Sequence, residues 1–423
     1  MPKQREVNWG GNVTYQAARV QHPETLGELS RLVRHADRVR ILGTRHTFNT
    51  LPDSTGDLIS LRSFDQILSL DQEDRTVTLQ GGVQYSELGQ FLHANGYALG
   101  NLPSLPHLSV AGACSTGTHG SGVRHQGLAS AVLSLELLTA DGEQVTCSRE
   151  RSGERFDGMV VALGALGAVT RLTLRVEPSY QVRQDVYERL SLDQVATRFG
   201  DVMIAGDSVS LFTTWQDERF DTLWLKRRVA ASDVSPAPVQ LFGGVLAEQD
   251  HHPVWGASAE SCTVQRGAPG AWHERLPHFR AGHTPSCGQE IQSEYLFPVE
   301  YAPAALRALF SIGARLAPLL YVSEVRTVAA DPFWLSPAYG RDSVAVHFTW
   351  RPDEPAVRSI LHEVEAVLAP FGARPHWGKV FETTPEQLEV LVPRLSDFRQ
   401  LTCAFDPIGK FRNNFLNRLI FGS

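Results

Sequence analysis

The chain has 423 residues, enough for two or three domains whose cores need no disulfides or metal ions. It carries 39 Lys and Arg against 46 Asp and Glu, and this net charge of −7 argues against a nucleic-acid-binding surface. With 42% hydrophobic and 20% charged residues, the composition also excludes disordered, collagen-like and membrane-bundle proteins. A globular enzyme or a large binding protein remains.

The five cysteines are odd in number and no two have C-x-x-C spacing, which predicts reduced thiols and no structural metal site. Residues 1–11 lack the apolar segment of a signal peptide, and the most apolar helical stretch, 304–322, is interrupted by two arginines and a proline. We therefore expect a cytoplasmic protein that contacts neither membranes nor nucleic acids. Since nothing indicates an obligate interface, we expect a monomer.

The first 180 residues alternate short helices with short strands. Helical periodicity predicts helices at 23–36, 86–95 and 156–163. Apolar runs bounded by turn residues predict strands at 39–42, 58–61, 76–79, 131–139, 144–147 and 168–176. Asp141-Gly142 predicts the turn of a hairpin, and a long loop of small residues is expected at 103–127.

After residue 180 the strands become longer and alternate more clearly. They are predicted at 209–215, 222–225, 292–297, 324–328 and 343–350, and helices at 302–316 and 356–368. This order indicates an antiparallel sheet with helices on one face, and hence an α+β protein with a domain boundary near residue 180. We interpret the basic run 224–228 as a strand end in solvent and His251-His252 as a surface loop without metal.

The usual nucleotide-binding and hydrolase motifs are absent: G-x-x-x-x-G-K-[ST], G-x-G-x-x-G after the first strand, G-x-S-x-G and H-E-x-x-H. Two loops of small residues, 42–49 and 109–122, follow predicted β elements instead. Small side chains let the backbone approach a ligand closely, and many N–H and hydroxyl groups can donate to a pyrophosphate. Composition alone fits a pair of tight turns that pack together equally well.

In order and spacing, the two loops resemble those of flavoproteins of the vanillyl-alcohol-oxidase type. Within that family, the chain resembles the bacterial alditol (xylitol) oxidases and the related sugar-lactone oxidases in particular. It extends to segments 8–12, 104–107, 162–167, 272–279, 293–295, 376–379 and 406–411. Glu324-Val325-Arg326-Thr327 and His347-Phe348-Thr349-Trp350 are typical of the alditol-oxidising branch.

This resemblance implies a two-part FAD-binding domain, formed by residues 1–180 and the C-terminal segment 376–423, with an α+β substrate cap domain, 181–375, over the isoalloxazine. It further implies FAD joined covalently through His46. The cofactor-binding residues implied are Gly43, Thr44, Arg45, His46, Thr47, Ser104, Ser109, Gly112, Ser115, Thr116, Gly117, Thr118, His119, Gly120 and Val169. Thr44 and Arg45 depart from the small residues common there; Arg45 is placed either to pair with phosphate or to reach solvent.

Strand periodicity groups the candidate substrate residues. Glu324 and Arg326 are two residues apart and share a strand face, as do His347 and Thr349. Taken alone, either pair also fits an exposed sheet face. The resemblance places these four residues with Ser104 and Lys379 around a polyol, which needs several donors and acceptors in fixed directions.

The roles implied are His347 as base, Glu324 orienting the C1 hydroxyl, Arg326 and Lys379 stabilising negative charge, and Ser104, Glu324, His347, Thr349 and Lys379 binding substrate. The reaction implied is oxidation of an alditol such as xylitol or sorbitol at C1, by hydride transfer to flavin N5, with reoxidation by O2 to hydrogen peroxide. The alternatives are a sugar-1,4-lactone oxidase or dehydrogenase with the same flavin site, and a flavin-binding protein without turnover. Pro103 stands where close relatives often carry Ala or Gly, which leaves the electron acceptor open.

Overall fold

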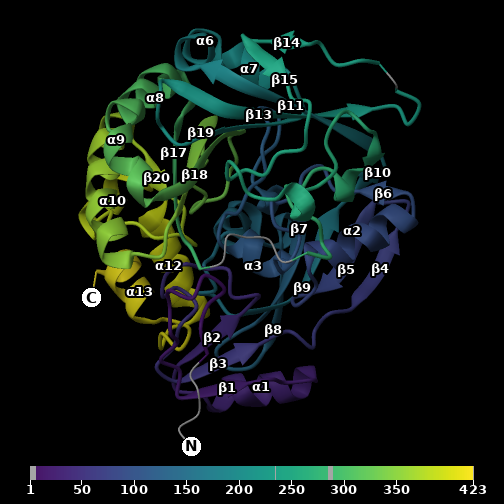
Figure 1. The fold of residues 1–423 in the computed structure, drawn as a ribbon. Coiled ribbons are helices and arrows are strands. Elements are labelled where there is room, and N and C mark those ends of the chain that lie inside the picture. The colour runs from purple at the N-terminus through teal and green to yellow at the C-terminus, as the bar shows by residue number, and fades with distance from the viewer. Residues whose placement is uncertain (1–5, 234, 284–288, 423) are drawn as a thin grey trace, which may run out of the picture.

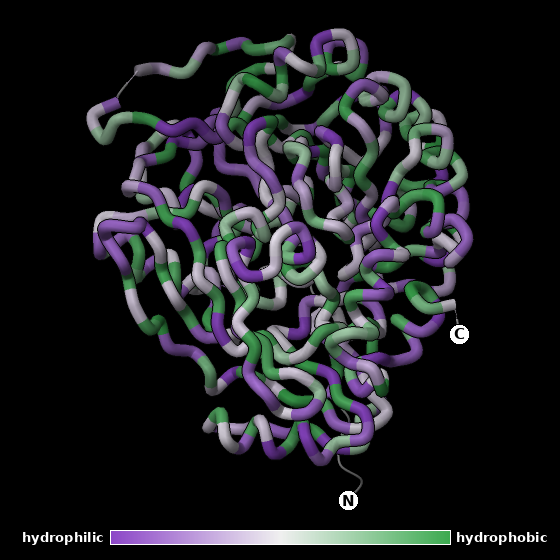
Figure 2. Tube along the Cα trace, turned by 180° about the vertical axis from the view of Figure 1, so that it is seen from behind, coloured by the Kyte–Doolittle hydropathy of each residue, from purple (hydrophilic) through white to green (hydrophobic). Residues whose placement is uncertain are grey.

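The N-terminal unit is a small parallel sheet with one connecting helix. The structure, a computed structural model, describes residues 6–233, 235–283 and 289–422. Strands β1 (Arg19–Gln21), β3 (Asp57–Ser60) and β2 (Val39–Leu42) pair in that order at the bottom of Figure 1, and helix α1 (Leu26–His35) connects β1 to β2. Hydrophobic and hydrophilic segments alternate along α1 in Figure 2, because Leu29 and Val33 are buried while its other face meets solvent.

A second, antiparallel sheet follows in the first 180 residues. Its strand order is β4 (Ile67–Asp71), β5 (Thr76–Gln80), β9 (Ala168–Arg175), β7 (Val132–Leu138) and β8 (Gln144–Ser148). The predicted hairpin turn is confirmed between β7 and β8, with Gly142 at φ 80°. The remaining elements are α2 (Tyr85–Ala94), β6 (Tyr97–Ala98), α3 (Val110–Ser115), α4 (Arg149–Ser152), α5 (Asp157–Val160) and β10 (Glu177–Pro178).

The chain beyond residue 180 builds a large antiparallel sheet, as predicted. Within the described ranges its order is β14 (Gln240–Leu241), β15 (Gly244–Leu246), β11 (Gln181–Ser191), β13 (Arg219–Val229), β12 (Ser208–Thr213), β18 (Leu320–Val328), β19 (Ser343–Trp350), β17 (Ile291–Pro298) and β20 (Arg374–Pro375). A short strand, β16 (Gly270–Ala271), also pairs with β11. We call this the cap sheet.

Helices cover the outer face of the cap sheet, which confirms the α+β class (Figure 1). They are α6 (Leu192–Thr197), α7 (Phe199–Ile204), α8 (Ala302–Ser311), α9 (Gly313–Leu316) and α10 (Glu354–Leu368). The inner face turns toward the N-terminal part of the chain.

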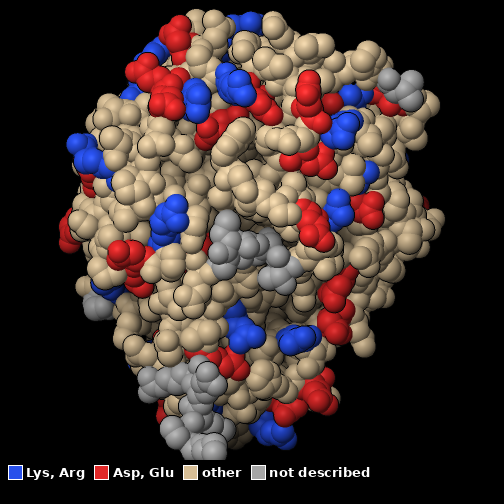
Figure 3. All heavy atoms as spheres, in the orientation of Figure 1, with Lys and Arg blue, Asp and Glu red and all other residues tan. Residues whose placement is uncertain are grey.

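Charged side chains of both signs are interspersed on the face of the molecule shown in Figure 3.

The C-terminal segment packs back onto the N-terminal sheet. After α11 (Pro385–Leu391) and α12 (Leu395–Phe405), the buried Lys410 donates from Nζ to the carbonyls of Val33 and Arg34 at 2.9 and 3.0 Å, and its own carbonyl accepts from Val39 N. Helix α13 (Asn414–Leu416) lies near the end of the chain. The domain limits at residues 180 and 375 stay predictions.

Two predicted helices are wrong in extent. The helix predicted at 156–163 ends at Val160, because Leu163 and Gly164 adopt φ of 54° and 67° and turn the chain. The helix predicted at 302–316 is interrupted at Ile312, beside Gly313, where a Cβ would lie 1.8 Å from Trp215 O. The loop predicted at 103–127 also contains α3.

The described cysteines form no disulfide: Cys114, Cys147 and Cys262 are buried and Cys403 is exposed, while Cys287 lies outside the described residues. No helix in the described part of the chain combines the length and the apolar character needed to cross a bilayer.

Candidate flavin and substrate site

A cavity of about 590 Å³ lies between the two small-residue loops and the inner face of the cap sheet. All of the predicted cofactor residues line it except Gly117, which packs beside Pro337, and Gly120, which faces Asn101. The predicted substrate and catalytic residues line the same cavity. Tertiary structure therefore brings together groups that are up to 336 residues apart in the sequence, from Gly43 to Lys379.

The first loop leaves β2 and curls over the cavity wall. Arg45 has φ 64°, a left-handed conformation that reverses the chain locally. The side chain of Arg45 pairs with Glu6 at 2.7 Å and is 43% exposed. Of the two alternatives given for Arg45, phosphate or solvent, the structure therefore shows the solvent-facing one. Thr44 Oγ1 accepts from Ser109 N at 3.3 Å and thereby ties the first loop to the second.

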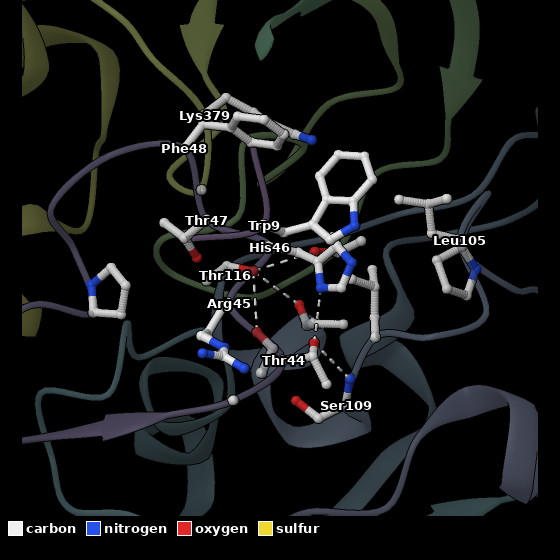
Figure 4. A pocket seen from close by; sticks show the side chains of 18 of the residues that line it. Trp9, Thr44, Arg45, His46, Thr47, Phe48, Leu105, Ser109, Thr116 and Lys379 are labelled. Carbon is white, nitrogen blue, oxygen red and sulfur yellow. Dashed lines mark hydrogen bonds between the residues drawn. The ribbon is translucent and has the colours of Figure 1, made fainter. Parts of the chain in front are cut away.

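His46 sits at the centre of this loop, against Trp9 (Figure 4). Its Nδ1 lies 3.1 Å from Thr44 Oγ1, and its ring stacks on the indole. Burial, reinforced by the positive charge of Lys379, lowers the pKa of His46 to about 4. The imidazole is therefore neutral at physiological pH and keeps a nitrogen lone pair.

The second loop carries Ser109, the short helix α3 and the threonines that follow. Gly43 and Gly112 flank Ser109 Oγ so closely that a Cβ on either would lie 2.8 or 2.7 Å from that atom. The hydroxyl groups of Thr116 and Thr118 lie 3.2 Å apart at the C-terminal end of α3. A side chain on Gly43 or Gly112 would therefore displace the Ser109 hydroxyl from its place between them.

These loops fit a dinucleotide. Within the described residues, the backbone N–H groups of residues 44–47 meet no hydrogen-bond acceptor. Hydroxyl groups of Thr44, Thr47, Ser109, Ser115, Thr116 and Thr118 line the same surface. A wall of unpaired amides and neutral hydroxyls suits a pyrophosphate, whose oxygens accept hydrogen bonds.

Arg326 organises the cap side of the cavity. It is buried between two carboxylates: Nη2 lies 2.5 Å from Glu294 Oε1, and Nε lies 3.5 Å from Glu324 Oε2. Its Nη1 lies 3.4 Å from Ser104 Oγ, on the loop that follows α2 and β6. Burial raises the pKa of Glu324, but Arg326 and His278 outweigh it, so the pKa of this carboxyl lies well below its usual range.

His347 faces Glu324 across the neighbouring strands β19 and β18, where the two residues are direct partners. Its Nε2 lies 3.2 Å from Thr349 Oγ1 and its Nδ1 lies 3.6 Å from Glu294 Oε2. Burial lowers the pKa of His347 although Glu294 opposes the shift. The ring is thus a neutral base next to a hydroxyl group, in the arrangement expected of a proton acceptor.

Lys379 completes the constellation from the C-terminal segment. Its ammonium donates to Gln292 Oε1 and lies 4.9 Å from the centre of the Phe48 ring. Burial lowers the pKa of Lys379 to about 8, with Glu294 opposing. Asn49 Nδ2 donates to the carbonyl of Lys379 at 2.7 Å, so the first loop and this segment are held together.

Sequence reasoning assigned no role to several polar residues that line the cavity, among them Gln292, Glu294, His278 and His376. Gln292 and Glu294 are two residues apart on β17, so the periodicity that singled out Glu324 and Arg326 could have found them. Glu294, His278 and His376 stood in segments of the resemblance without an assigned role. His376 Nδ1 accepts from Gly378 N at 3.0 Å, and burial lowers the pKa of His376 to about 3.

Two expectations about other polar residues are wrong. Lys226, in the basic run expected in solvent, is 1% exposed because it points inward from β13. His251 and His252 are also buried, and His251 Nε2 lies 2.7 Å from Glu188 Oε1. In the described ranges, no three His, Cys, Asp or Glu side chains form a group that could hold a metal ion.

Comparison with known proteins agrees with this geometry. Residues 17–148 match the family described as FAD binding domain, and residues 286–419 match the family described as D-arabinono-1,4-lactone oxidase. An alditol oxidase from a Streptomyces species is 47% identical over 98% of this chain and 99% of its own length. An L-gulono-1,4-lactone dehydrogenase from Mycobacterium tuberculosis is 28% identical over 98% of both chains. A solved structure of a solvent-stable cholesterol oxidase has a TM-score of 0.78 over 99% of this chain and 97% of its own, at 15% identity, which shows a shared fold.

The fold and the two loops define a flavoprotein of the vanillyl-alcohol-oxidase type, an oxidoreductase whose cofactor is FAD. Within that class, the chain belongs to the alditol oxidase family, to which sugar-lactone oxidases and dehydrogenases are more distantly related.

Proposed function

We propose that this protein oxidises the terminal C1 hydroxyl of an alditol such as xylitol or sorbitol to the aldose, with O2 as electron acceptor and hydrogen peroxide as the second product. The observation that carries the proposal is the convergence of two carboxylates, two cations and a neutral histidine on one wall of the cavity: Glu294, Glu324, Arg326, Lys379 and His347. A flexible polyol needs several hydrogen-bond partners in fixed directions, and this wall provides them. The similarity to an alditol oxidase over nearly the whole chain supports the same substrate class.

The cofactor would be held by the two small-residue loops, with covalent attachment at His46. The neutral imidazole of His46 is a suitable nucleophile, and its stack on Trp9 limits its rotation. When bound, FAD supplies two-electron oxidation by accepting a hydride from the substrate carbon. Gly43 and Gly112 line the cavity and add no side chain to the wall that these loops form.

The side chains on the cap side would orient the substrate and take its proton. His347 accepts the hydroxyl proton, because burial keeps the imidazole unprotonated. Glu324 remains an anion and accepts a hydrogen bond from a substrate hydroxyl, since Arg326 and His278 stabilise its charge. Arg326 and Lys379 supply positive charge that would stabilise the negative charge of a reduced cofactor. Ser104 and Thr349 bind hydroxyl groups further along the carbon chain of the substrate.

A sugar-1,4-lactone is the second candidate substrate. The match of residues 286–419 to D-arabinono-1,4-lactone oxidase favours it, because these residues include Glu294, Glu324, Arg326, His347 and Lys379. The two substrates differ in their needs: an alditol presents a freely rotating primary hydroxyl, whereas a lactone presents a ring hydroxyl beside a carbonyl. A comparison of flavin-reduction rates with xylitol and with aldono-1,4-lactones separates them.

The test uses purified holoenzyme mixed with excess xylitol in the absence of O2, followed by admission of air. We expect the flavin absorbance to bleach and then to recover with formation of hydrogen peroxide. Bleaching without recovery would identify an alditol dehydrogenase. Absence of bleaching with alditols, together with rapid bleaching by lactones, would overturn the substrate assignment.

A further inference from the structure

A buried lysine lies directly behind the substrate wall. Lys226 does not line the cavity, yet its Nζ lies 3.2 Å from Nδ1 of His278, which does. His278 Nε2 in turn lies 2.7 Å from Glu324 Oε1. The three side chains form a continuous chain of contacts from the protein interior to the substrate cavity, and each is at most 6% exposed.

The surroundings of Lys226 specify the direction of these hydrogen bonds. The ammonium has three N–H donors and no acceptor, and it meets three acceptors: the carbonyls of Leu276 and Pro277, at 2.6 and 2.9 Å, and His278 Nδ1. His278 Nδ1 must therefore accept, which places the proton of the neutral ring on Nε2. That proton is donated to Glu324 Oε1.

The ring of His278 has little freedom to depart from this arrangement. It packs edge-on against Phe212 and Trp224, with ring centroids 5.5 and 5.2 Å apart. Its backbone N–H donates to Ser104 O at 3.1 Å, which ties it to another predicted substrate residue. His278 donates to Oε1 of Glu324, whereas Oε2 has an ion-pair contact with Arg326 Nε at 3.5 Å and no hydrogen bond within the described residues, so Oε2 can accept from a substrate hydroxyl.

We propose that Lys226 and His278 are positioning residues of the substrate site: Lys226 selects the His278 tautomer that donates to Glu324, and this bond orients the carboxylate toward a substrate hydroxyl. The polyol part of this inference rests on the proposed function. The tautomer part does not, since it follows from the acceptors around Lys226.

The arrangement makes substrate affinity depend on pH. Burial lowers the pKa of Lys226 to about 7, with Glu324 opposing. The other groups that face the ammonium are His278, whose pKa burial lowers to about 4, the thiol of Cys262, whose pKa burial raises to about 12, and the Trp224 ring.

Its partners across the sheet, Gln184 and Ser208, are uncharged. When Lys226 loses its proton, the neutral amine has two N–H donors for three acceptors, so its hydrogen bond to His278 Nδ1 weakens. The ring keeps its Nε2–H on the Glu324 carboxylate, but it is held less firmly in that position.

Two measurements on the holoenzyme test the inference. The first is the ¹⁵N spectrum of histidine-labelled protein, in which the His278 signal is identified by its loss in His278→Phe, a variant that preserves aromatic packing. We expect the Nε2–H tautomer between about pH 6 and 9, with a change in the Nδ1 chemical shift as the pH passes about 7 that is absent in Lys226→Met. A wild-type ring in the Nδ1–H form at low pH would overturn the proposal.

The second measurement is the KM for xylitol and the limiting rate of flavin reduction between about pH 6 and 9. We expect wild-type KM to rise as the pH passes about 7, whereas Lys226→Met and His278→Phe show a KM raised about tenfold at low pH, with the limiting rate changed less than about threefold. Lys410→Met is the matched control, because it removes another buried ammonium that donates to two backbone carbonyls and does not line the cavity. It should behave as wild type.

A wild-type KM in Lys226→Met and His278→Phe would contradict the positioning role. If Lys226→Met does not fold, His278→Phe and the wild-type spectrum decide the question. If no polyol reduces wild-type flavin, the proposed function fails, and the tautomer assignment is judged by the spectrum alone.

Discussion

The imidazole of His46 stacks on the indole of Trp9, with ring centroids 5.2 Å apart and an angle of 22° between the planes. The same tryptophan donates from its backbone N to Arg45 O at 2.8 Å, so the N-terminal segment holds both the side chain and the backbone of the first loop. The stack restricts an otherwise rotatable ring before any cofactor is attached. It therefore presents the neutral imidazole in a defined direction within the cavity.

Replacement of His46 tests the covalent link. We expect His46→Ala to release all of its flavin on acid precipitation, because no nitrogen remains to hold the cofactor, whereas the wild-type pellet stays yellow and its band fluoresces on a denaturing gel. His107→Ala is the control, since His107 belongs to the next loop but does not line the cavity. Flavin that remains bound to denatured His46→Ala would assign the link to another residue.

Replacement of Lys379 tests the charge in the cavity. We expect Lys379→Met to lower the rate of flavin reduction about 100-fold, since the variant removes a preorganised cation near the developing negative charge. Because the pKa of Lys379 is lowered to about 8, the wild-type rate should decline as the pH rises through that value. Lys379→Arg should lose this decline, because a guanidinium does not titrate there. Stopped-flow reduction over a pH series measures both effects, and an unchanged rate in Lys379→Met would remove the residue from the reaction.

Loss of Arg326 should destabilise the fold as well as the site. We expect Arg326→Met to lower the free energy of unfolding by about 3–5 kcal/mol, because the buried carboxylates Glu294 and Glu324 lose the guanidinium between them and keep only imidazole neighbours. Arg358→Met is the matched control: Arg358 also meets two carboxylates, at 2.8 and 2.6 Å, but is 44% exposed, and its loss should cost less than about 1 kcal/mol. Thermal unfolding of the holoenzymes compares them, and equal losses would contradict the role of burial.

Pro103 lines the cavity beside Ser104, and its ring occupies space that an alanine would leave open. We expect Pro103→Ala to raise the second-order rate of flavin reoxidation by O2, with little change in the rate of reduction by xylitol. Pro106→Ala serves as the control, because Pro106 belongs to the same loop and does not line the cavity. A reoxidation rate equal to that of wild type would show that Pro103 does not limit the access of O2.

Local sequence patterns predicted most of the elements that carry the site. The strand expected at 39–42 has the same limits in the structure, and Glu324 and Arg326 share a face of β18 as their spacing indicates. Patterns failed where a distant contact decides the backbone, as at Gly313, which lies against the Trp215 carbonyl. A period of two or 3.6 residues reports local geometry and carries no information about such a contact.

The burial of individual charged side chains was the property that the sequence predicted least well. A basic run such as 224–228 is normally solvated, and nothing in its sequence indicates that Lys226 meets three acceptors inside the protein. The same holds for Glu294, whose role depends on Arg326, 32 residues away.

The sequence by itself determined the α+β class, the two small-residue loops and the pairs of polar residues that share a strand face, because spacing along the chain sets the direction of side chains in regular structure. Which of these groups meet in one cavity, and in which protonation state, depends on how distant segments pack. Burial and the approach of opposite charges set the pKa values of His46, His347, Glu324 and Lys379, and both arise when distant segments pack together.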